Sequence, residues 1–78
     1  MNAEINRIKQ KFPNGTRIEL IALEDPYTKL KTGDTGTVDF VDDTGQIHMK
    51  WDTGSNLALI PGEDSFKIIE KPKSSTVL

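Results

Sequence analysis

The chain has 78 residues, with 10 basic and 12 acidic side chains, a formal net charge of −2 and no cysteine. This length predicts one domain with a small core and argues against a large active-site cleft, and the lack of cysteine excludes disulfides, cysteine-ligated zinc and thiol redox chemistry. No apolar run approaches the roughly 20 residues that span a bilayer, and no signal-peptide core is visible, so we expect a cytoplasmic protein with no membrane partner.

The N-terminal stretch predicts a short amphipathic helix over residues 1–12. Ile5, Ile8 and Phe12 recur at the spacing of one helix face, and Asn2 stands at the N-cap position. The Pro-Asn-Gly sequence that follows stops the helix. Because a helix this short is marginal alone, it must dock on the domain, bind a partner or fray.

After the helix, the hydrophobic period changes to two, the period of a strand with one buried face. The pattern predicts five strands, over residues 16–23, 36–41, 46–51, 55–60 and 65–69. Tight-turn residues separate most of these strands, whereas a long connection over 24–34 follows the first one. We expect one domain over 13–70, followed by a disordered tail over 71–78 that is rich in Lys, Pro and Ser.

The central hairpin has a register that its turn predicts. A four-residue loop over 42–45 would be closed by Gly45 in the left-handed conformation. Residues of the two strands would then pair in this order: Val41 with Gln46, Phe40 with Ile47, and Val38 with Met49. Phe40 and Val38 would face the core, and Asp39 would lie opposite His48 on the outer face.

Five short strands, a long first loop and three tight turns resemble an SH3-like barrel. Three stretches, GTRIELIALEDPYTKLKTGDTGTV, FVDDTGQIHMKWDTGS and LIPGEDSF, are similar to a small uncharacterised family. This family is found in Gram-positive bacteria, their phages and their conjugative elements, and the resemblance covers about residues 12–69. It implies an all-β, five-stranded SH3-like barrel with a short N-terminal helix and a genomic setting, but no activity and no catalytic residue.

The sequence offers little material for catalysis. His48 alternates with core residues, which predicts a surface position, and the serines fall in turns or the tail, so no nucleophile–base pair is indicated. Asp42 and Asp43 share a turn but lack the spacing of a calcium loop. The glycines at 33 and 36 lead into a strand, unlike a phosphate-binding loop. We predict no enzyme, no metal site and no cofactor.

The first functional hypothesis is an interaction module that docks a protein or peptide in a groove between the long first loop and the acidic turns at 42–43 and 52. Aromatic residues supply contact area in such a groove, and acidic residues steer the partner. Tyr27 is open between packing and contact, and Trp51 is open between core and ligand platform. The candidate partner-binding residues are Asp25, Tyr27, Asp42, Asp43, Trp51 and Asp52.

The alternative hypothesis, from a different class, is nucleic-acid binding on the outer face of the sheet, with Tyr27 stacking on a base. The residues that would bind nucleic acid are Arg17, Tyr27, Lys29, Lys31, His48 and Lys50. A sequence pI of about 5.2 argues against this hypothesis, because nucleic-acid binders typically carry a basic face and a high pI.

Overall fold

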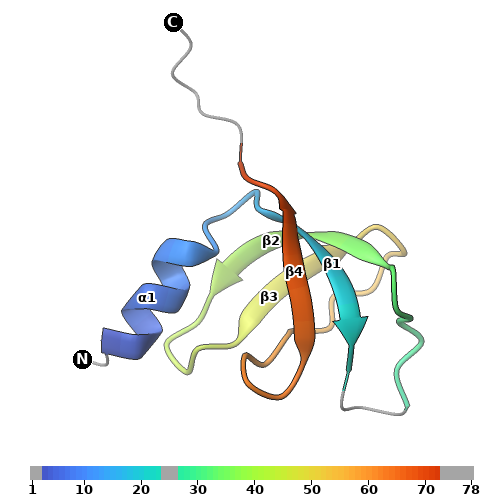
Figure 1. The fold of residues 1–78 in the computed structure, drawn as a ribbon, viewed down its shortest axis with the longest axis horizontal. Coiled ribbons are helices and arrows are strands. Elements are labelled where there is room, and N and C mark those ends of the chain that lie inside the picture. The colour runs from blue at the N-terminus through green and yellow to red at the C-terminus, as the bar shows by residue number, and fades with distance from the viewer. Residues whose placement is uncertain (1–2, 24–26, 73–78) are drawn as a thin grey trace, which may run out of the picture.

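A computed structural model describes residues 3–23 and 27–72 of the chain. Its elements are α1 (Ala3–Lys11), β1 (Arg17–Ala22), β2 (Thr35–Val41), β3 (Ile47–Trp51) and β4 (Ser65–Glu70). The strands form one antiparallel sheet in the order β3-β2-β1-β4, with α1 beside it (Figure 1). The protein is mostly β with one short N-terminal helix. Most of the tail predicted over 71–78 lies outside the described residues.

The helix forms as the apolar spacing predicts, and it docks on the sheet. Ile8 packs against the core, and Phe12, directly after the helix, is buried. The backbone N–H of Phe12 donates to the carbonyl of Ile8 at 3.0 Å, which continues the helical hydrogen bonding past Lys11. Lys9 Nζ lies 2.7 Å from Asp43 Oδ1 in the turn between β2 and β3. Docking on the domain is therefore the alternative that the structure selects.

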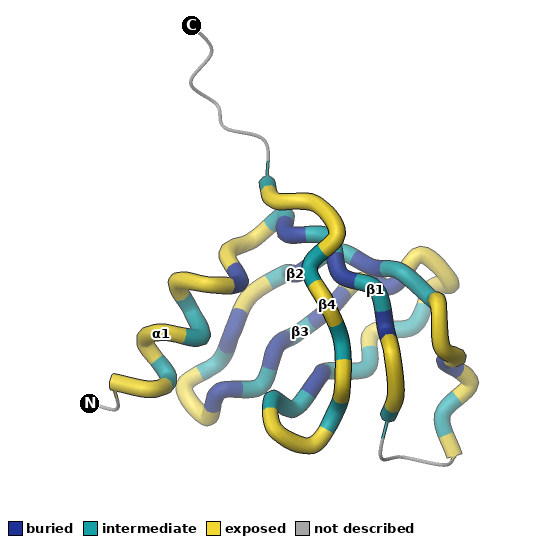
Figure 2. The backbone as a smooth tube through the Cα atoms, viewed as in Figure 1, coloured by how far each residue is buried: buried dark blue, intermediate teal, exposed yellow. Residues whose placement is uncertain are grey.

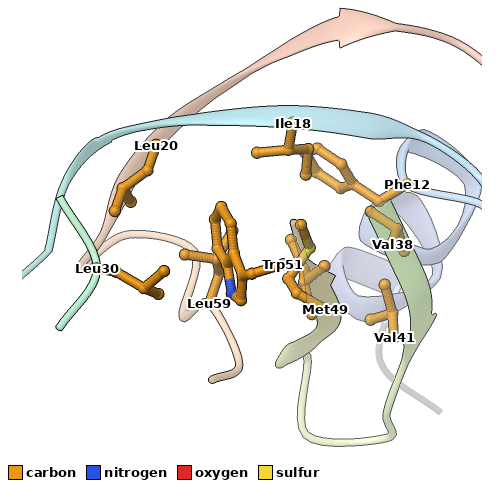
Figure 3. Packing of buried hydrophobic residues seen from close by; sticks show 10 residues of the cluster. Phe12, Ile18, Leu20, Leu30, Val38, Val41, Met49, Trp51 and Leu59 are labelled. Carbon is orange, nitrogen blue, oxygen red and sulfur yellow. The ribbon is translucent and has the colours of Figure 1, made fainter. Parts of the chain in front are cut away.

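The core lies inside the curved sheet, and most of its residues come from the strand positions that the period of two marked as inward (Figures 2 and 3). Its buried apolar side chains are Phe12, Ile18, Leu20, Leu30, Val38, Val41, Ile47, Met49, Trp51 and Leu59. Gly36 lies opposite Trp51 in the β2–β3 ladder. A Cβ at Gly36 would stand 2.9 Å from both Cα and Cε3 of Trp51, so the glycine makes room for the indole.

The strand predicted over 55–60 is wrong, and the described residues form a four-stranded open sheet rather than a closed five-stranded barrel. One isolated bridge joins Leu59 to Ile47, with backbone hydrogen bonds of 2.8 and 2.9 Å. Other carbonyls of this segment accept hydrogen bonds from Trp51. The backbone N–H of Trp51 donates to the carbonyl of Ser55, and its Nε1 donates to the carbonyl of Leu57. These carbonyls bond to Trp51 instead of extending a ladder.

The β2–β3 hairpin keeps one predicted pair and changes the others. The observed pairs include Val38 with Met49, Phe40 with His48, and Val41 with Ile47. Asp42 N donates to the carbonyl of Gln46 at 3.0 Å, and Asp42 Oδ1 accepts from Gln46 N at 3.0 Å. These two bonds narrow the loop to residues 43–45, with Gly45 at a φ of 90° as its left-handed residue. The predicted four-residue loop is wrong, whereas the left-handed Gly45 is confirmed.

A bulge between Val38 and Phe40 restores the register further along the hairpin and turns Phe40 outward. Phe40 is 50% exposed, and its ring stacks on the His48 imidazole, with centroids 4.4 Å apart and planes 4° from parallel. The predicted pairing of Asp39 with His48 is wrong, because the bulge moves Asp39 out of that position.

Candidate functional site

The two acidic turns proposed as walls of one groove lie at opposite ends of β3. Asp42 and Asp43 precede this strand, beside α1, and Asp52 follows it, beside the start of β2. The length of β3 therefore separates the two turns. The structure divides the predicted partner-binding residues into separate environments.

At one end, Asp52 is held in a polar network on the outer face of the sheet. Arg17 donates to both carboxylate oxygens of Asp52, from Nη1 at 2.8 Å and from Nη2 at 2.6 Å. Thr35 Oγ1 donates to the same carboxylate at 2.7 Å, and Thr37 Oγ1 accepts from Arg17 at 2.9 Å. The hydrogen bonds from Arg17 and Thr35 hold the pKa of Asp52 far below its ordinary value, and Asp52 raises the pKa of Arg17. This network fastens β1 to the turn after β3.

The lowered pKa of Asp52 predicts a loss of stability in acid. Folding favours the ionised carboxylate, so its stabilisation is complete above the pKa of the unfolded chain, about 4, and is lost as the pH falls below that value. We expect the free energy of unfolding of the Asp52→Asn variant to fall less steeply than that of the wild type between about pH 5 and about pH 2. Urea unfolding at a series of pH values measures both slopes.

The matching change on the donor, Arg17→Met, should also make the free energy of unfolding fall less steeply in acid, because it removes the main cause of the lowered pKa of Asp52. Parallel curves for the wild type and Asp52→Asn would contradict the assignment of Asp52 to this network.

At the other end of β3, Asp42 organises the hairpin turn. Its Oδ1 accepts hydrogen bonds from Thr44 Oγ1 at 2.6 Å and from Thr44 N at 2.9 Å, and its Oδ2 lies 2.7 Å from His48 Nε2. The Thr44 hydroxyl, followed by His48, lowers the pKa of Asp42 strongly. Its neighbour Asp43 is 96% exposed and pairs with Lys9 of the helix. Asp42 therefore shapes the turn, while Asp43 pairs with the helix at the surface.

The aromatic candidates also separate. Trp51 is only 4% exposed and lies in the core, which is one of the two positions that the sequence left open for it. Tyr27 is 92% exposed, in the segment before the buried Leu30. Asp25 lies outside the described residues.

Among the nucleic-acid candidates, Lys29, Lys31 and Lys50 are exposed, whereas Arg17 is engaged by Asp52 and His48 lies beside Asp42. The exposed lysines therefore remain available on the surface, and the two engaged side chains already have acidic partners. Phe40, which sequence reasoning placed in the core, adds an exposed aromatic ring next to His48.

A hollow lies where no site was predicted, between α1 and the start of β4. It has a volume of about 770 Å³, and residues 44–46 of the hairpin turn contribute to its lining. Its apolar lining includes Ile5, Ile8, Phe12, Ile60, Pro61 and Phe66. Phe12 and Phe66 meet edge to face, with ring centroids 5.6 Å apart. We call this feature the α1–β4 groove.

The sequence carried one signal for the α1–β4 groove, the apolar stripe of Ile5, Ile8 and Phe12. The stripe indicates that one face of the helix is apolar and must be buried. It does not indicate that docking on the sheet buries only part of that face. In the structure Phe12 is buried, whereas Ile5 and Ile8 keep intermediate exposure. The missing information is tertiary: α1 comes close to β2 and stands away from β4.

Within the described ranges 3–23 and 27–72, no group of three or more His, Cys, Asp or Glu side chains is placed to hold a metal ion. No helix in the same part of the chain is long and apolar enough to cross a membrane.

These observations define a small, mostly β domain with a docked N-terminal helix and a groove between this helix and β4, lined by apolar and polar side chains. Residues 1–69 match the sequence model of a domain of unknown function, DUF4314, and the chain belongs to this family. Neither a curated protein nor a solved structure matches the chain.

Proposed function

We propose that the domain is a non-catalytic, cytoplasmic interaction module that docks a peptide or protein segment with apolar side chains in the α1–β4 groove. The observation that carries this proposal is the groove itself. Its volume of about 770 Å³ falls within the usual range for ligand sites, and side chains such as Ile5, Ile60 and Phe66 line it. An origin in Gram-positive bacteria, their phages or their conjugative elements is part of the proposal, supported by the resemblance of the three sequence stretches.

The geometry around His48 favours binding over catalysis. In a hydrolytic triad, histidine lies between the nucleophilic hydroxyl and the carboxylate. Here Asp42 lies between His48 and the Thr44 hydroxyl, which donates to Asp42 Oδ1. The Thr44 hydroxyl therefore bonds to the Asp42 carboxylate rather than to His48, an arrangement that stabilises the turn and does not activate the hydroxyl as a nucleophile.

A random peptide library displayed on phage and selected against the full chain tests the proposal. We expect enriched peptides with regularly spaced apolar residues, because Ile5, Ile8 and Phe66 offer apolar contacts between the polar groups of the lining. Substituting Ile5→Lys should weaken binding of the enriched peptides at least about tenfold, by placing a charge in the wall. Isothermal titration of each peptide against the wild type and the variant measures the change.

The matched control is Phe40→Lys, the same kind of change at a half-exposed apolar residue that does not line the groove. It should leave peptide affinity unchanged. The proposal fails if no peptide is enriched, or if Ile5→Lys keeps its fold by circular dichroism and binds every enriched peptide as the wild type does.

A second candidate function, nucleic-acid binding, is favoured by one observation. Tyr27 is 92% exposed and is followed by the exposed Lys29 and Lys31, a combination that suits base stacking and phosphate contact. A gel shift with single-stranded and double-stranded DNA and RNA at low salt tests it, and the complex must weaken as salt is added.

A further inference from the structure

The strand that borders the α1–β4 groove is an edge strand. The sheet order β3-β2-β1-β4 gives β4 one strand neighbour, β1, among the described residues. Alternate N–H and C=O groups of an edge strand point away from its neighbour, and they can hydrogen bond to a strand that is added beside it. The groove therefore combines apolar side chains such as Ile5, Ile8 and Phe66 with a backbone edge.

The regular part of this edge is short, because β4 pairs irregularly with β1 near its end. Arg17 lies opposite Glu70 and Ile18 opposite Ile68, which leaves Ile69 as an extra residue in β4. A bulge interrupts further pairing at that point. The edge open to regular pairing therefore runs from Ser65 to Ile68, about 13 Å at the rise of a β-strand.

The helix stands across the groove from this edge. Figure 1 shows β1 on one side of β4 and α1 on the other, and residues of α1 and of the start of β4 line the same groove. Ile5 and Ile8 come from the helix and Phe66 from the strand. An extended peptide that paired with β4 would direct alternate side chains onto these apolar residues.

The two ends of the groove differ in charge. Among the residues that line the groove, Glu4 lies in the first turn of the helix and Asp64 immediately precedes β4, whereas Lys11 ends the helix. Helix and strand both rise from the lower to the upper part of Figure 1, so the acidic groups gather at one end and Lys11 lies at the other. A peptide that pairs antiparallel to β4 would place its N-terminal part near Lys11 and its C-terminal part near the acidic end.

We propose that the occupant of the α1–β4 groove is an extended peptide that adds a strand antiparallel to residues 65–68 of β4, with apolar side chains at alternate positions, acidic residues toward its N-terminus and basic residues toward its C-terminus. This inference rests on the proposed function, since it names the class of partner for the same groove. Antiparallel pairing is slightly more stable per residue than parallel pairing, and the charge order follows from the two ends of the groove.

Two synthetic peptides of about ten residues test the inference, each with valine alternating with threonine at its centre. One has two glutamates at its N-terminal end and two lysines at its C-terminal end, and the other has the same composition with the charges exchanged. The probes are titrated into the 15N-labelled full chain, followed by NMR spectra and amide hydrogen exchange. We expect the first peptide to shift resonances of Ile5, Ile8 and residues 65–68, and to slow exchange of amides within 65–68. The charge-exchanged peptide should bind about fivefold more weakly, as expected for two exposed ion pairs.

Three outcomes would overturn strand addition. The first is that neither peptide shifts any resonance of the labelled chain at concentrations up to about 1 mM, a dissociation constant that marks very weak binding. The second is equal affinity for the two peptides. The third is a chain that already dimerises on its own with amides 65–68 protected, which would make a second copy the occupant of the edge.

Phage-selected peptides separate this inference from the proposed function. If they lose affinity for Ile5→Lys but leave amides 65–68 unprotected, the groove is a docking site and the occupant is not an added strand. If no selected peptide depends on Ile5, the proposed function fails together with the inference.

Discussion

Replacing Leu59 with alanine is expected to leave much of the protein unfolded. Leu59 is fully buried and belongs to the same core cluster as Trp51 (Figure 3). Truncating a buried leucine destabilises a protein by about 2–5 kcal/mol, because apolar contacts are lost and a cavity remains. A single core of this size rarely supplies more than about 3–5 kcal/mol, so the loss is comparable to the total stability. Urea unfolding followed by the fluorescence of Trp51 measures the change.

The matched control is Leu57→Ala, which truncates a partly buried leucine two positions away in the same irregular segment. It should cost clearly less than Leu59→Ala, since less apolar surface is removed from the core. Equal losses would show that the segment contributes through its backbone, including the bond from Trp51 Nε1 to the Leu57 carbonyl, rather than through Leu59.

Gly45→Val is expected to lower the free energy of unfolding by about 1–3 kcal/mol, for two reasons. Gly45 has a φ of 90°, where a β-branched residue is strained. In addition, a Cβ at this position would lie 3.6 Å from Ile5 Cγ1 and 3.8 Å from Ile8 Cδ1, so the methyl groups of valine would press against the helix. Thermal unfolding followed by circular dichroism measures the loss.

Gly54→Val separates these two causes. Gly54 has a φ of 98°, and no atom lies within 4 Å of the position of an added Cβ, so this variant introduces backbone strain without displacing the helix. A smaller loss for Gly54→Val than for Gly45→Val would measure the contact with α1. Equal losses would contradict a role of Gly45 in seating the helix.

The strands could be predicted where one face is buried throughout. In β1, Ile18 and Leu20 alternate with polar residues and are buried, and in β3 Ile47, Met49 and Trp51 do the same. Residues 55–60 show a similar alternation without forming a strand. Periodicity reports which side chains are buried but not which backbone groups accept hydrogen bonds, and here Trp51 takes the carbonyls of Ser55 and Leu57.

The hairpin shows a second limit of sequence reasoning. Matching apolar residues across the strands favoured a core position for Phe40. The register instead follows the turn, because the Asp42 carboxylate accepts bonds from Thr44 and Gln46 and fixes a loop over 43–45. A bulge then restores the pairing of Val38 with Met49. Local side-chain bonds and a bulge of this kind leave no trace in hydrophobic periodicity.

The candidate site was less predictable than the fold, because it depends on residues that are distant in sequence. Nothing local to Asp52 indicates that Arg17 engages both of its carboxylate oxygens, or that the acidic turns lie at opposite ends of β3. Likewise, the α1–β4 groove arises from the spacing between a helix and a strand at opposite ends of the chain. The apolar stripe of α1 could be predicted from the sequence, but the partial exposure of Ile5 and Ile8 in the docked helix could not.

The pairing of the first strand with the last has a consequence for how the protein folds as it is synthesised. Ile18 lies opposite Ile68, so β1 gains this neighbour only after nearly the whole described chain has left the ribosome. The β2–β3 hairpin, by contrast, joins adjacent segments and can form while translation continues. At about 5–20 residues per second the interval lasts only seconds, but during it Ile18 and Leu20 lack the cover of Phe66 and Ile68. We therefore expect nascent chains stalled before β4 to be sensitive to protease and to bind chaperones, with protection arriving in one step once β4 emerges.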